Sequence, residues 1–441
     1  MTIVLRVFLL VWALLWTAGL PAVLFYLWRR GRKDPVYWSA LAERFGRYDK
    51  ALAGAVWVHA VSLGELRSAV PLIRGLLDQG HNIVTTHFTP AGRSEAEKVF
   101  SAEIAAGRVR AVWVPFDVGW ALSGFFRTFR PAYGLVMEIE IWPGMVFSAR
   151  KHGVPLFMCN AQYPENSLRR DSGGLRLRQQ VMQGFAGALV KSDLQANRFA
   201  GAGVRNIAVT GELRFDQPVP HNLVREGVAA RRWIGAGERR VICIASAIEG
   251  EDEVYLRAIN DLNLHCRENG LPKPLVVYVP RRPERFDEVA QMLASSGFSV
   301  LRRSGLGSVF SPDHWPAIDE CPDIFLGDSL GEMYGYLAMA DQVIVGGGFS
   351  PKGAHNISEA LVLGKPVVTG PHTHTIEFPF AEARAAGVAA SVLDAAALSA
   401  WLIRGSYPNP KAIADFVATQ VNATERTLHA IPRLLSAVKP S

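Results

Sequence analysis

Residues 342–359, QVIVGGGFSPKGAHNISE, join an apolar strand pattern to the start of a helix through a run of glycines. Glycine lets the backbone approach an anion closely, and an opening helix directs unpaired N–H groups and its positive dipole end toward the same place. Lys352 adds a mobile positive charge. The spacing matches neither a P-loop nor a dinucleotide fingerprint, because Lys352 is not followed by Ser or Thr and G-x-G-x-x-G is absent. The stretch therefore predicts a phosphate-binding turn of an α/β sheet, for a ligand other than ATP or NAD.

The same alternation of short apolar segments and helical patterns runs along most of the chain, which predicts parallel sheets covered by helices. The expected strands of a first series are 55–60, 82–86, 111–114, 133–137, 155–159, 188–191 and 207–210. Those of a second series are 241–245, 275–279, 299–301, 323–326, 342–345 and 366–369. Ligands of such sheets sit at the carboxyl ends of the strands, so a cleft between two such domains is the expected site.

Domain boundaries follow from where the pattern fails. The stretch 216–235 is polar and basic and contains Gln-Pro-Val-Pro, so we expect a linker there. The prediction is a membrane anchor with its basic flank at 1–33, a first α/β domain at 34–215 and a second at 236–441. The last helical pattern, near 411–436, could return to the first domain.

Composition narrows the class of protein. With 441 residues, 49% of them hydrophobic and 20% charged, the chain is too long for one usual core and is not largely disordered. The four cysteines lack C-x-x-C spacing, which favours a reducing compartment and gives no cysteine metal site. The net charge of +7 suits an acidic partner, whether nucleic acid, phosphate or an anionic lipid surface.

The N-terminus favours the lipid surface. Residues 7–28 are apolar and uncharged, which as a helix is about 33 Å, enough to cross the hydrocarbon core. Arg29, Arg30, Arg32 and Lys33 follow, and the positive-inside rule places the rest of the chain in the cytoplasm. A cleaved signal peptide fits less well, because the apolar run is long and its basic side is C-terminal. A monotopic helix lying in the interface stays open as an alternative.

Several charged residues follow strands and have both a structural and a functional interpretation. Ser246-Ala-Ile-Glu249 and Ser329-Leu-Gly-Glu332 match capping boxes, and capping is the favoured role of both glutamates. Asn356-Ile-Ser-Glu359 is an Asn variant of the same pattern, but Glu359 could equally accept hydrogen bonds from a ribose.

Basic and acidic side chains also follow strands elsewhere. At least one of Arg281, Arg282 and Arg285, which follow the strand at 275–279, is expected to meet a phosphate or carboxylate. Glu138 and Glu140 alternate, so both should point to one face of an extended segment. Glu65 begins a helix after His59-Ala-Val-Ser-Leu-Gly64; there the helix dipole should keep its pKa low, unless burial opposes that effect. His372 and His374 fit a polar loop better than a zinc site.

Taken together, these segments resemble the 3-deoxy-D-manno-octulosonic acid (Kdo) transferases of lipopolysaccharide synthesis. The resemblance is carried by the anchor and by 57–65 (WVHAVSLGE), 137–143 (MEIEIWP), 280–286 (PRRPERF), 327–332 (GDSLGE), 346–359 and 370–373 (GPHT). It implies a GT-B architecture, in which two Rossmann-like domains face a central cleft. It further implies inverting, metal-independent transfer of Kdo from CMP-Kdo to a lipid A precursor, with no cofactor.

The resemblance also implies roles for individual residues. Glu65 matches the family's catalytic base. Ser62, Gly64, Glu138 and Glu140 would lie on the acceptor side. The donor would be bound by Ser246, Glu249, Arg281, Arg282, Arg285, Gly347, Gly348, Lys352, Gly353, His355, Asn356 and Glu359. The expected partners are a lipid A precursor, a CMP-sugar and the cytoplasmic surface of the bacterial inner membrane; nucleic-acid binding is not expected, since no aromatic-basic RNA motif is present.

Some positions depart from the family's usual residues, namely Gln162, Ala247, Ile248, Arg282 and Ala354. They leave two alternatives open. One is a transferase of the same fold that uses another nucleotide sugar or a modified lipid. The other is a membrane-tethered scaffold without turnover.

Overall fold

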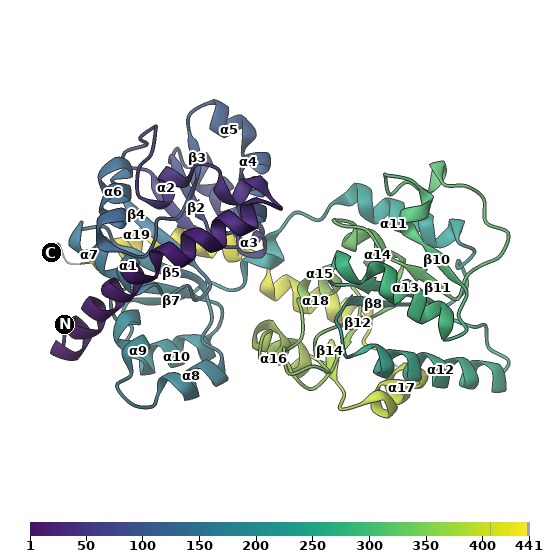
Figure 1. The fold of residues 1–441 in the computed structure, drawn as a ribbon. Helices are drawn as coiled ribbons and strands as arrows, with labels where there is room; N and C mark the ends of the chain where they lie inside the picture. The colour runs from purple at the N-terminus through teal and green to yellow at the C-terminus, as the bar shows by residue number, and fades with distance from the viewer. Residues whose placement is uncertain (406, 439–441) are drawn as a thin grey trace. The chain divides into compact units, whose positions relative to one another are not determined.

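The computed structural model describes residues 1–405 and 407–438, which form two compact units, each coloured by position along the chain in Figure 1. The first unit comprises residues 1–217 together with the chain from Val421 onward, and the second comprises residues 218–420. Each unit is built around one parallel sheet.

The sheet of the first unit has seven parallel strands in the order β3-β2-β1-β4-β5-β6-β7. These are β1 (Val56–His59), β2 (Ile83–His87), β3 (Val109–Trp113), β4 (Tyr133–Met137), β5 (Leu156–Ala161), β6 (Gly187–Val190) and β7 (Ile207–Val209). The central strands β1 and β4 are buried at every position, as expected where helices cover both faces. All seven strands predicted for this domain are present.

Helices cover both faces of this sheet. They are α1 (Ile3–Gly31), α2 (Leu41–Arg44), α3 (Leu63–Asp78), α4 (Pro90–Val99), α5 (Ser101–Ala105), α6 (Gly119–Phe129), α7 (Pro143–Lys151), α8 (Glu165–Asp171), α9 (Leu177–Met182), α10 (Asp193–Gly201) and α19 (Ala423–Ser436), with short 3-10 turns η1 (Pro35–Trp38) and η2 (Leu213–Asp216). Apolar residues of α3 and α19 form one core with one face of the sheet, and those of α6, α7 and α10 form another with the opposite face.

The second unit repeats this architecture. Its parallel strands run β10-β11-β9-β8-β12-β13-β14. They are β8 (Val241–Ala247), β9 (Leu275–Pro280), β10 (Val300–Arg302), β11 (Ile324–Leu326), β12 (Gln342–Val345), β13 (Val367–Thr369) and β14 (Ala389–Ser391). The helices are α11 (His221–Trp233), α12 (Asp252–Glu268), α13 (Phe286–Ser295), α14 (Met333–Met339), α15 (Ser358–Val362), α16 (Glu377–Ala385), α17 (Ala395–Arg404) and α18 (Pro410–Gln420), with 3-10 turns η3 (Pro283–Arg285), η4 (Arg303–Leu306) and η5 (Pro312–His314). The sequence missed only β14, a three-residue edge strand of small side chains.

The predicted linker at 216–235 is wrong for most of its length, because α11 occupies 221–233. Its buried positions are Gly227 and Ala230, which give no strong apolar period. Instead α11 packs closely on α14, since a Cβ added at Gly227 would lie 2.2 Å from the carbonyl oxygen of Gly335. The border between the units falls at Gln217 and Pro218.

The return of the last helical pattern to the first domain is seen for α19, which belongs to the first unit, whereas α18 stays in the second. Leu428 on α19 packs against Gly75 of α3, where an added Cβ would meet its Cδ1 at 2.6 Å. The backbone amides of Asn422 and Thr424 donate to the carboxylate of Asp216 at 2.7 and 2.5 Å. The chain thus returns to close the core of its first sheet.

The N-terminal helix α1 has 29 residues. Within the described part of the chain it is the one helix long and apolar enough, by length and composition, to cross a membrane. It does not stand apart from the first unit, because it contacts η1, α7 and α9.

Candidate active site

Glu65 lies at the start of α3, directly beyond the carboxyl end of β1. Ser62 caps the helix, since its Oγ accepts the Glu65 amide at 3.3 Å. The Glu65 carboxylate reaches back, accepting the Val61 amide at 2.7 Å and the Ser62 hydroxyl at 3.0 Å. These reciprocal bonds form a capping box, while Gly64 in the same turn is exposed. The carboxylate is therefore held in one orientation.

Burial raises the pKa of Glu65 to about 7, and the charges of Glu140 and Glu138 act in the same direction. The exception allowed for in the prediction applies, because burial opposes and outweighs the lowering of this pKa expected from the helix dipole. The side chain is only partly exposed, and desolvation of its charged form outweighs the two hydrogen bonds that favour that form. A carboxylate with a pKa near 7 is well matched to general base catalysis at neutral pH.

Glu138 and Glu140 do not lie on one extended strand. Glu138 follows the end of β4 in a turn with φ 57°, so the expected alternation is broken. Its carboxylate accepts from Lys191 at 3.0 and 3.2 Å, whereas Glu140 accepts the indole N–H of Trp142 at 2.8 Å. Both charges still influence Glu65.

Lys191 is the centre of a buried polar network at the carboxyl ends of β4, β5 and β6. Its Nζ lies 3.0 Å from Glu138 Oε2 and 2.7 Å from Glu212 Oε2, and its side chain is 1% exposed. Asn160 Nδ2 donates to the same two carboxylates at 3.0 and 2.9 Å. Burial alone would raise the pKa of Glu212, but the charges of Lys191 and Arg214 hold it below its usual value.

Lys191 and Glu212 were not predicted as members of this site. A signal was available, because Lys191 directly follows β6 and Glu212 lies shortly after β7. Polar side chains at those strand ends face the ligand side of a parallel sheet.

In the second unit the glycine loop is built around Glu251, a residue that the sequence analysis also missed. Glu251 is fully buried, and its carboxylate accepts the amides of Gly347 and Phe349, each at 2.7 Å. It also accepts the Tyr255 hydroxyl at 3.0 Å. Two loop amides expected to hold a phosphate are therefore occupied by a carboxylate of the protein, and that part of the prediction is wrong.

The loop is closely packed at its glycines. Gly347 has φ 90°, and a Cβ at Gly348 would lie 2.2 Å from Thr369 Oγ1. A Cβ at Gly353, with φ 92°, would meet Thr375 Cγ2 at 2.6 Å. Close packing against the neighbouring loop, in addition to any anion, explains the glycines.

The helix after the loop, α15, has only five residues. Asn356 does not form a capping box with Glu359; its Oδ1 accepts the Ser358 amide at 2.9 Å, and the position before the helix is Ile357. Glu359 is partly buried, and its charge contributes to the raised pKa of Tyr334. Lys352 is exposed.

The two capping boxes predicted with serine are also wrong. Ser246 has φ 61°, and α12 begins only at Asp252, which leaves Glu249 exposed. Glu332 occupies the position before α14 without capping it; its carboxylate accepts from Arg303 at 2.8 Å and from the hydroxyl of Ser329.

The three arginines after β9 have different environments. Arg285 is 8% exposed, and its Nη2 lies 2.8 Å from Asp252 Oδ2. Arg281 and Arg282 are exposed. Burial, helped by the charge of Arg281, lowers the pKa of His355 to about 4, so this imidazole is neutral at pH 7. The structure therefore leaves Arg281, Arg282 and Lys352 as the exposed cations of the donor-side prediction.

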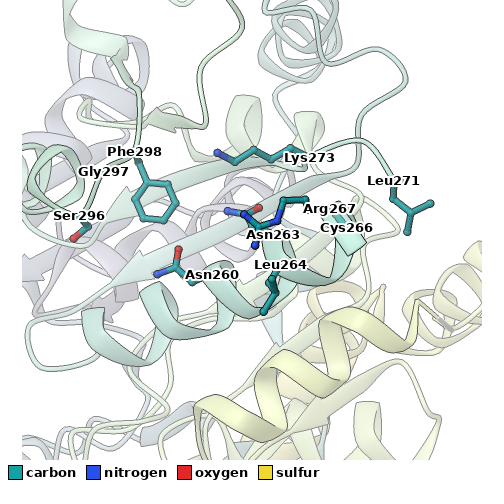
Figure 2. A pocket seen from close by; sticks show the side chains of 10 residues that line it. All are labelled: Asn260, Asn263, Leu264, Cys266, Arg267, Leu271, Lys273, Ser296, Gly297 and Phe298. Carbon is teal, nitrogen blue, oxygen red and sulfur yellow. The ribbon is translucent and has the colours of Figure 1, made fainter. Parts of the chain in front are cut away.

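A pocket of about 550 Å³ lies elsewhere in the second unit (Figure 2). It is lined by the end of α12 and by Lys273 and Phe298, which precede β9 and β10. It is therefore at the amino ends of the strands, opposite the glycine loop. Lys273 is already paired with Asp323 at 2.6 Å. Within residues 1–405 and 407–438 no group of three His, Cys, Asp or Glu residues could hold a metal ion.

Comparison with solved structures identifies the fold to which this chain belongs. Two parallel α/β units, each built around a seven-stranded sheet with polar side chains beyond its strand ends, define a GT-B fold. A solved glycosyltransferase from Rickettsia africae ESF-5 has this fold, with a TM-score of 0.56, 11% identity, and coverage of 88% of this chain and 100% of that chain.

Sequence comparison gives the family. Residues 39–217 match the model of 3-deoxy-D-manno-octulosonic-acid transferase (kdotransferase). The chain is 37% identical to a 3-deoxy-D-manno-octulosonic acid transferase of Bordetella pertussis, over 93% of this chain and 96% of the relative. It is 30% identical to one of Haemophilus influenzae over 81% of each. The chain belongs to the Kdo transferase family.

Proposed function

We propose that this Kdo transferase moves Kdo from CMP-Kdo to a hydroxyl of a lipid A precursor in lipopolysaccharide core biosynthesis, with inversion and without a metal or cofactor. The family membership supports the transferred sugar. The observation that carries the mechanism is the held Glu65 carboxylate, whose pKa of about 7 suits a general base.

In the proposed reaction Glu65 accepts the proton of the acceptor hydroxyl. The hydroxyl oxygen forms a bond to the anomeric carbon of Kdo while the bond from that carbon to the phosphate oxygen of CMP breaks. The bonding electron pair leaves with CMP. Attack from the face opposite the departing phosphate inverts the configuration. Ser62 and Gly64 shape the turn that presents Glu65. Burial keeps its pKa high, and the charges of Glu140 and Glu138 act in the same direction.

The donor is assigned to the second unit. The exposed cations Arg281, Arg282 and Lys352 would neutralise the CMP phosphate and the Kdo carboxylate, which is the task a metal performs in other transferases. Glu359 would bind the ribose, and Ser246, Glu249, Gly353, His355 and Asn356 would complete the donor site. Glu251 would fix the path of Gly347 and Gly348 from inside. Arg285 acts indirectly, by holding the start of α12 through Asp252.

The positions that depart from the family's usual residues raise the question of which donor and acceptor the protein uses. Ala247 and Ala354 are buried, so neither side chain can contact a ligand directly. Ile248 and Arg282 in the second unit, and Gln162 in the first, keep accessible side chains at which the chemistry is altered. A different nucleotide sugar, a modified lipid acceptor, or loss of turnover are the alternatives that these changes raise.

A product assay separates these possibilities. The purified protein would be given CMP-Kdo and tetra-acylated lipid A precursor in a metal chelator, and the lipid analysed by mass spectrometry. Kdo-modified lipid supports the proposal. Thermal stabilisation by CMP-Kdo without product favours another acceptor or a silent scaffold, while stabilisation by a different nucleotide sugar alone identifies another donor.

We further propose that the enzyme acts at the cytoplasmic face of the bacterial inner membrane, where α1 keeps the protein beside its lipid acceptor.

A further inference from the structure

The N-terminal helix is docked lengthwise on its own domain. Leu5 and Leu27, near its two ends, are each only 4% exposed. They are 22 residues apart, which in a helix is about 33 Å. Between them, Phe8, Leu9, Trp16, Leu20, Val23 and Leu24 pack against the apolar clusters of the first unit. The buried and partly buried positions recur at helical spacing, so one stripe of α1 faces the protein. Figure 1 shows the helix running along the first unit.

Polar contacts hold α1 in this position at its N-terminal end and near its middle. Trp12 Nε1 donates to Asp117 Oδ2 at 2.7 Å, and the same carboxylate accepts the amides of Gly144 and Met145 at the start of α7. Thr2 Oγ1 donates to Gln180 Oε1 at 2.6 Å. If α1 crossed a bilayer in this packing, Asp117 and the elements beneath it would have to enter the hydrocarbon core. A spanning orientation is therefore incompatible with the observed contacts.

The opposite stripe of α1 is exposed and apolar. Its large side chains are Ile3, Val4, Val7, Leu10, Val11, Leu14, Leu15, Phe25, Tyr26 and Trp28. Leu14 and Leu15, at the centre, are 61% and 65% exposed. An apolar face of this length on a water-soluble surface marks an interaction site. Residues 1–33 contain no Asp or Glu.

Positive charge flanks both ends of this face. Arg29, Arg30, Arg32 and Lys33 are exposed at the C-terminal end of the helix. At its N-terminal end, Arg6 is exposed, and exposed Arg176 directly precedes α9, which contacts α1. A long apolar face bordered by arginines complements a single leaflet with anionic headgroups.

We propose that α1 lies in the membrane plane as a monotopic anchor, with its outward stripe seated in one leaflet of an anionic bilayer while its inward stripe stays on the first unit. This inference rests on the membrane association proposed above and specifies its mode. Both ends of α1 then lie on the cytoplasmic side, and the first unit is held flat against the acceptor's leaflet.

Sided labelling tests the topology. Thr2→Cys and Ser39→Cys, each in a Cys321→Ser background because the other cysteines are buried, would be treated with a membrane-impermeant maleimide in inverted inner-membrane vesicles. The proposal predicts that both positions are labelled before detergent is added. Labelling of position 39 alone, with position 2 reacting only after detergent, would show a spanning helix and overturn it.

Vesicle sedimentation tests whether the outward stripe of α1 binds lipid. The protein would be mixed with phosphatidylethanolamine and phosphatidylglycerol vesicles, and the partition coefficient of Leu14→Glu/Leu15→Glu should fall by more than about tenfold. Leu264→Glu and Leu393→Glu, exposed leucines of the second unit, are the matched controls and should bind normally. Unchanged binding of the double variant would contradict the proposal. Neither readout requires turnover, so its failure is distinct from failure of the transferase proposal.

Discussion

Glu251 accepts the amide of Gly347 at 2.7 Å and so binds the glycine loop to the start of α12 across 96 positions of sequence. The carboxylate is fully buried, and its charge is stabilised by backbone N–H groups instead of a cation. The loop therefore has a fixed shape before any ligand binds.

Replacing Glu251 by Gln should loosen this loop, because the amide group of Gln turns an N–H toward one of the loop N–H donors. We expect the free energy of unfolding of the second unit to fall by about 2–3 kcal/mol. The affinity for CMP should fall by about tenfold, measured by calorimetry. Glu253→Gln, an exposed neighbour, is the control. Equal CMP affinity for Glu251→Gln and the native chain would contradict the assigned role.

Gly348→Ala tests the close packing of the same loop. The added Cβ would lie 2.2 Å from Thr369 Oγ1 and 2.5 Å from the Gly370 amide nitrogen, so the loop must move. We expect a loss of about 1–3 kcal/mol in stability and a raised KM for the donor. The control is Gly201→Ala, where nothing lies within 4 Å of the new atom, and it should leave stability and the KM for the donor unchanged. A similar KM for Gly348→Ala and Gly201→Ala would be evidence against a rigid loop.

Lys191→Met should be strongly destabilising, by about 3–5 kcal/mol, because it leaves the buried Glu212 and the partly buried Glu138 without their nearest cation. The double variant with Glu212→Gln should recover part of the loss. Lys98→Met, on an exposed position of α4, serves as the control in thermal denaturation. No recovery in the double variant would mean that the two charges are not coupled.

Stability at acid pH should report the same network. Because the folded pKa of Glu212 lies below its usual value, its stabilising contribution is fully present at pH 7 and is lost as the pH falls below about 4.5. The Glu212→Gln variant should therefore lose stability relative to the native chain at pH 7 and approach it near pH 3. A difference in melting temperature that is the same at both pH values would argue against the ion pair.

The effect of Glu65 on stability should change with pH in the opposite direction to that of Glu212. Its folded pKa is raised to about 7, so ionisation costs stability progressively from about pH 4.5 to 7 and by a constant amount above that. Glu65→Gln should be more stable than the native chain by about 1–3 kcal/mol at pH 8 and equally stable near pH 4.5. Melting temperatures of the two proteins at these pH values test this; lower stability of Glu65→Gln at pH 8 would assign the carboxylate a mainly structural role.

The sheets could be predicted because each strand is a short, nearly continuous apolar run, as in Val56–His59 and Gln342–Val345. The helix α11 could not be predicted in the same way, because its contacts are made by small residues such as Gly227. The strand β14 was missed for the same reason, being Ala389-Ala-Ser391.

The site was predictable only in part. Glu65 could be placed at a helix start, but its pKa depends on burial by segments far along the chain. The pairing of Lys191 with Glu138 and Glu212, and of Glu251 with the glycine loop, joins residues whose spacing carries no local signal. The capping patterns at Ser246 and Ser329 predicted helix starts that are too early, because α12 begins at Asp252 and α14 at Met333.

The role of Glu65 as general base is tested by the pH dependence of CMP release from CMP-Kdo, measured for the native chain and for Glu65→Gln with lipid A precursor and a metal chelator present. The account predicts lipid-dependent release that rises as the pH passes through about 7 and is reduced by about a thousandfold or more in Glu65→Gln. Glu97→Gln, an exposed glutamate on α4, should match the native chain. Release by Glu65→Gln at the native rate, with the same pH profile, would contradict the account.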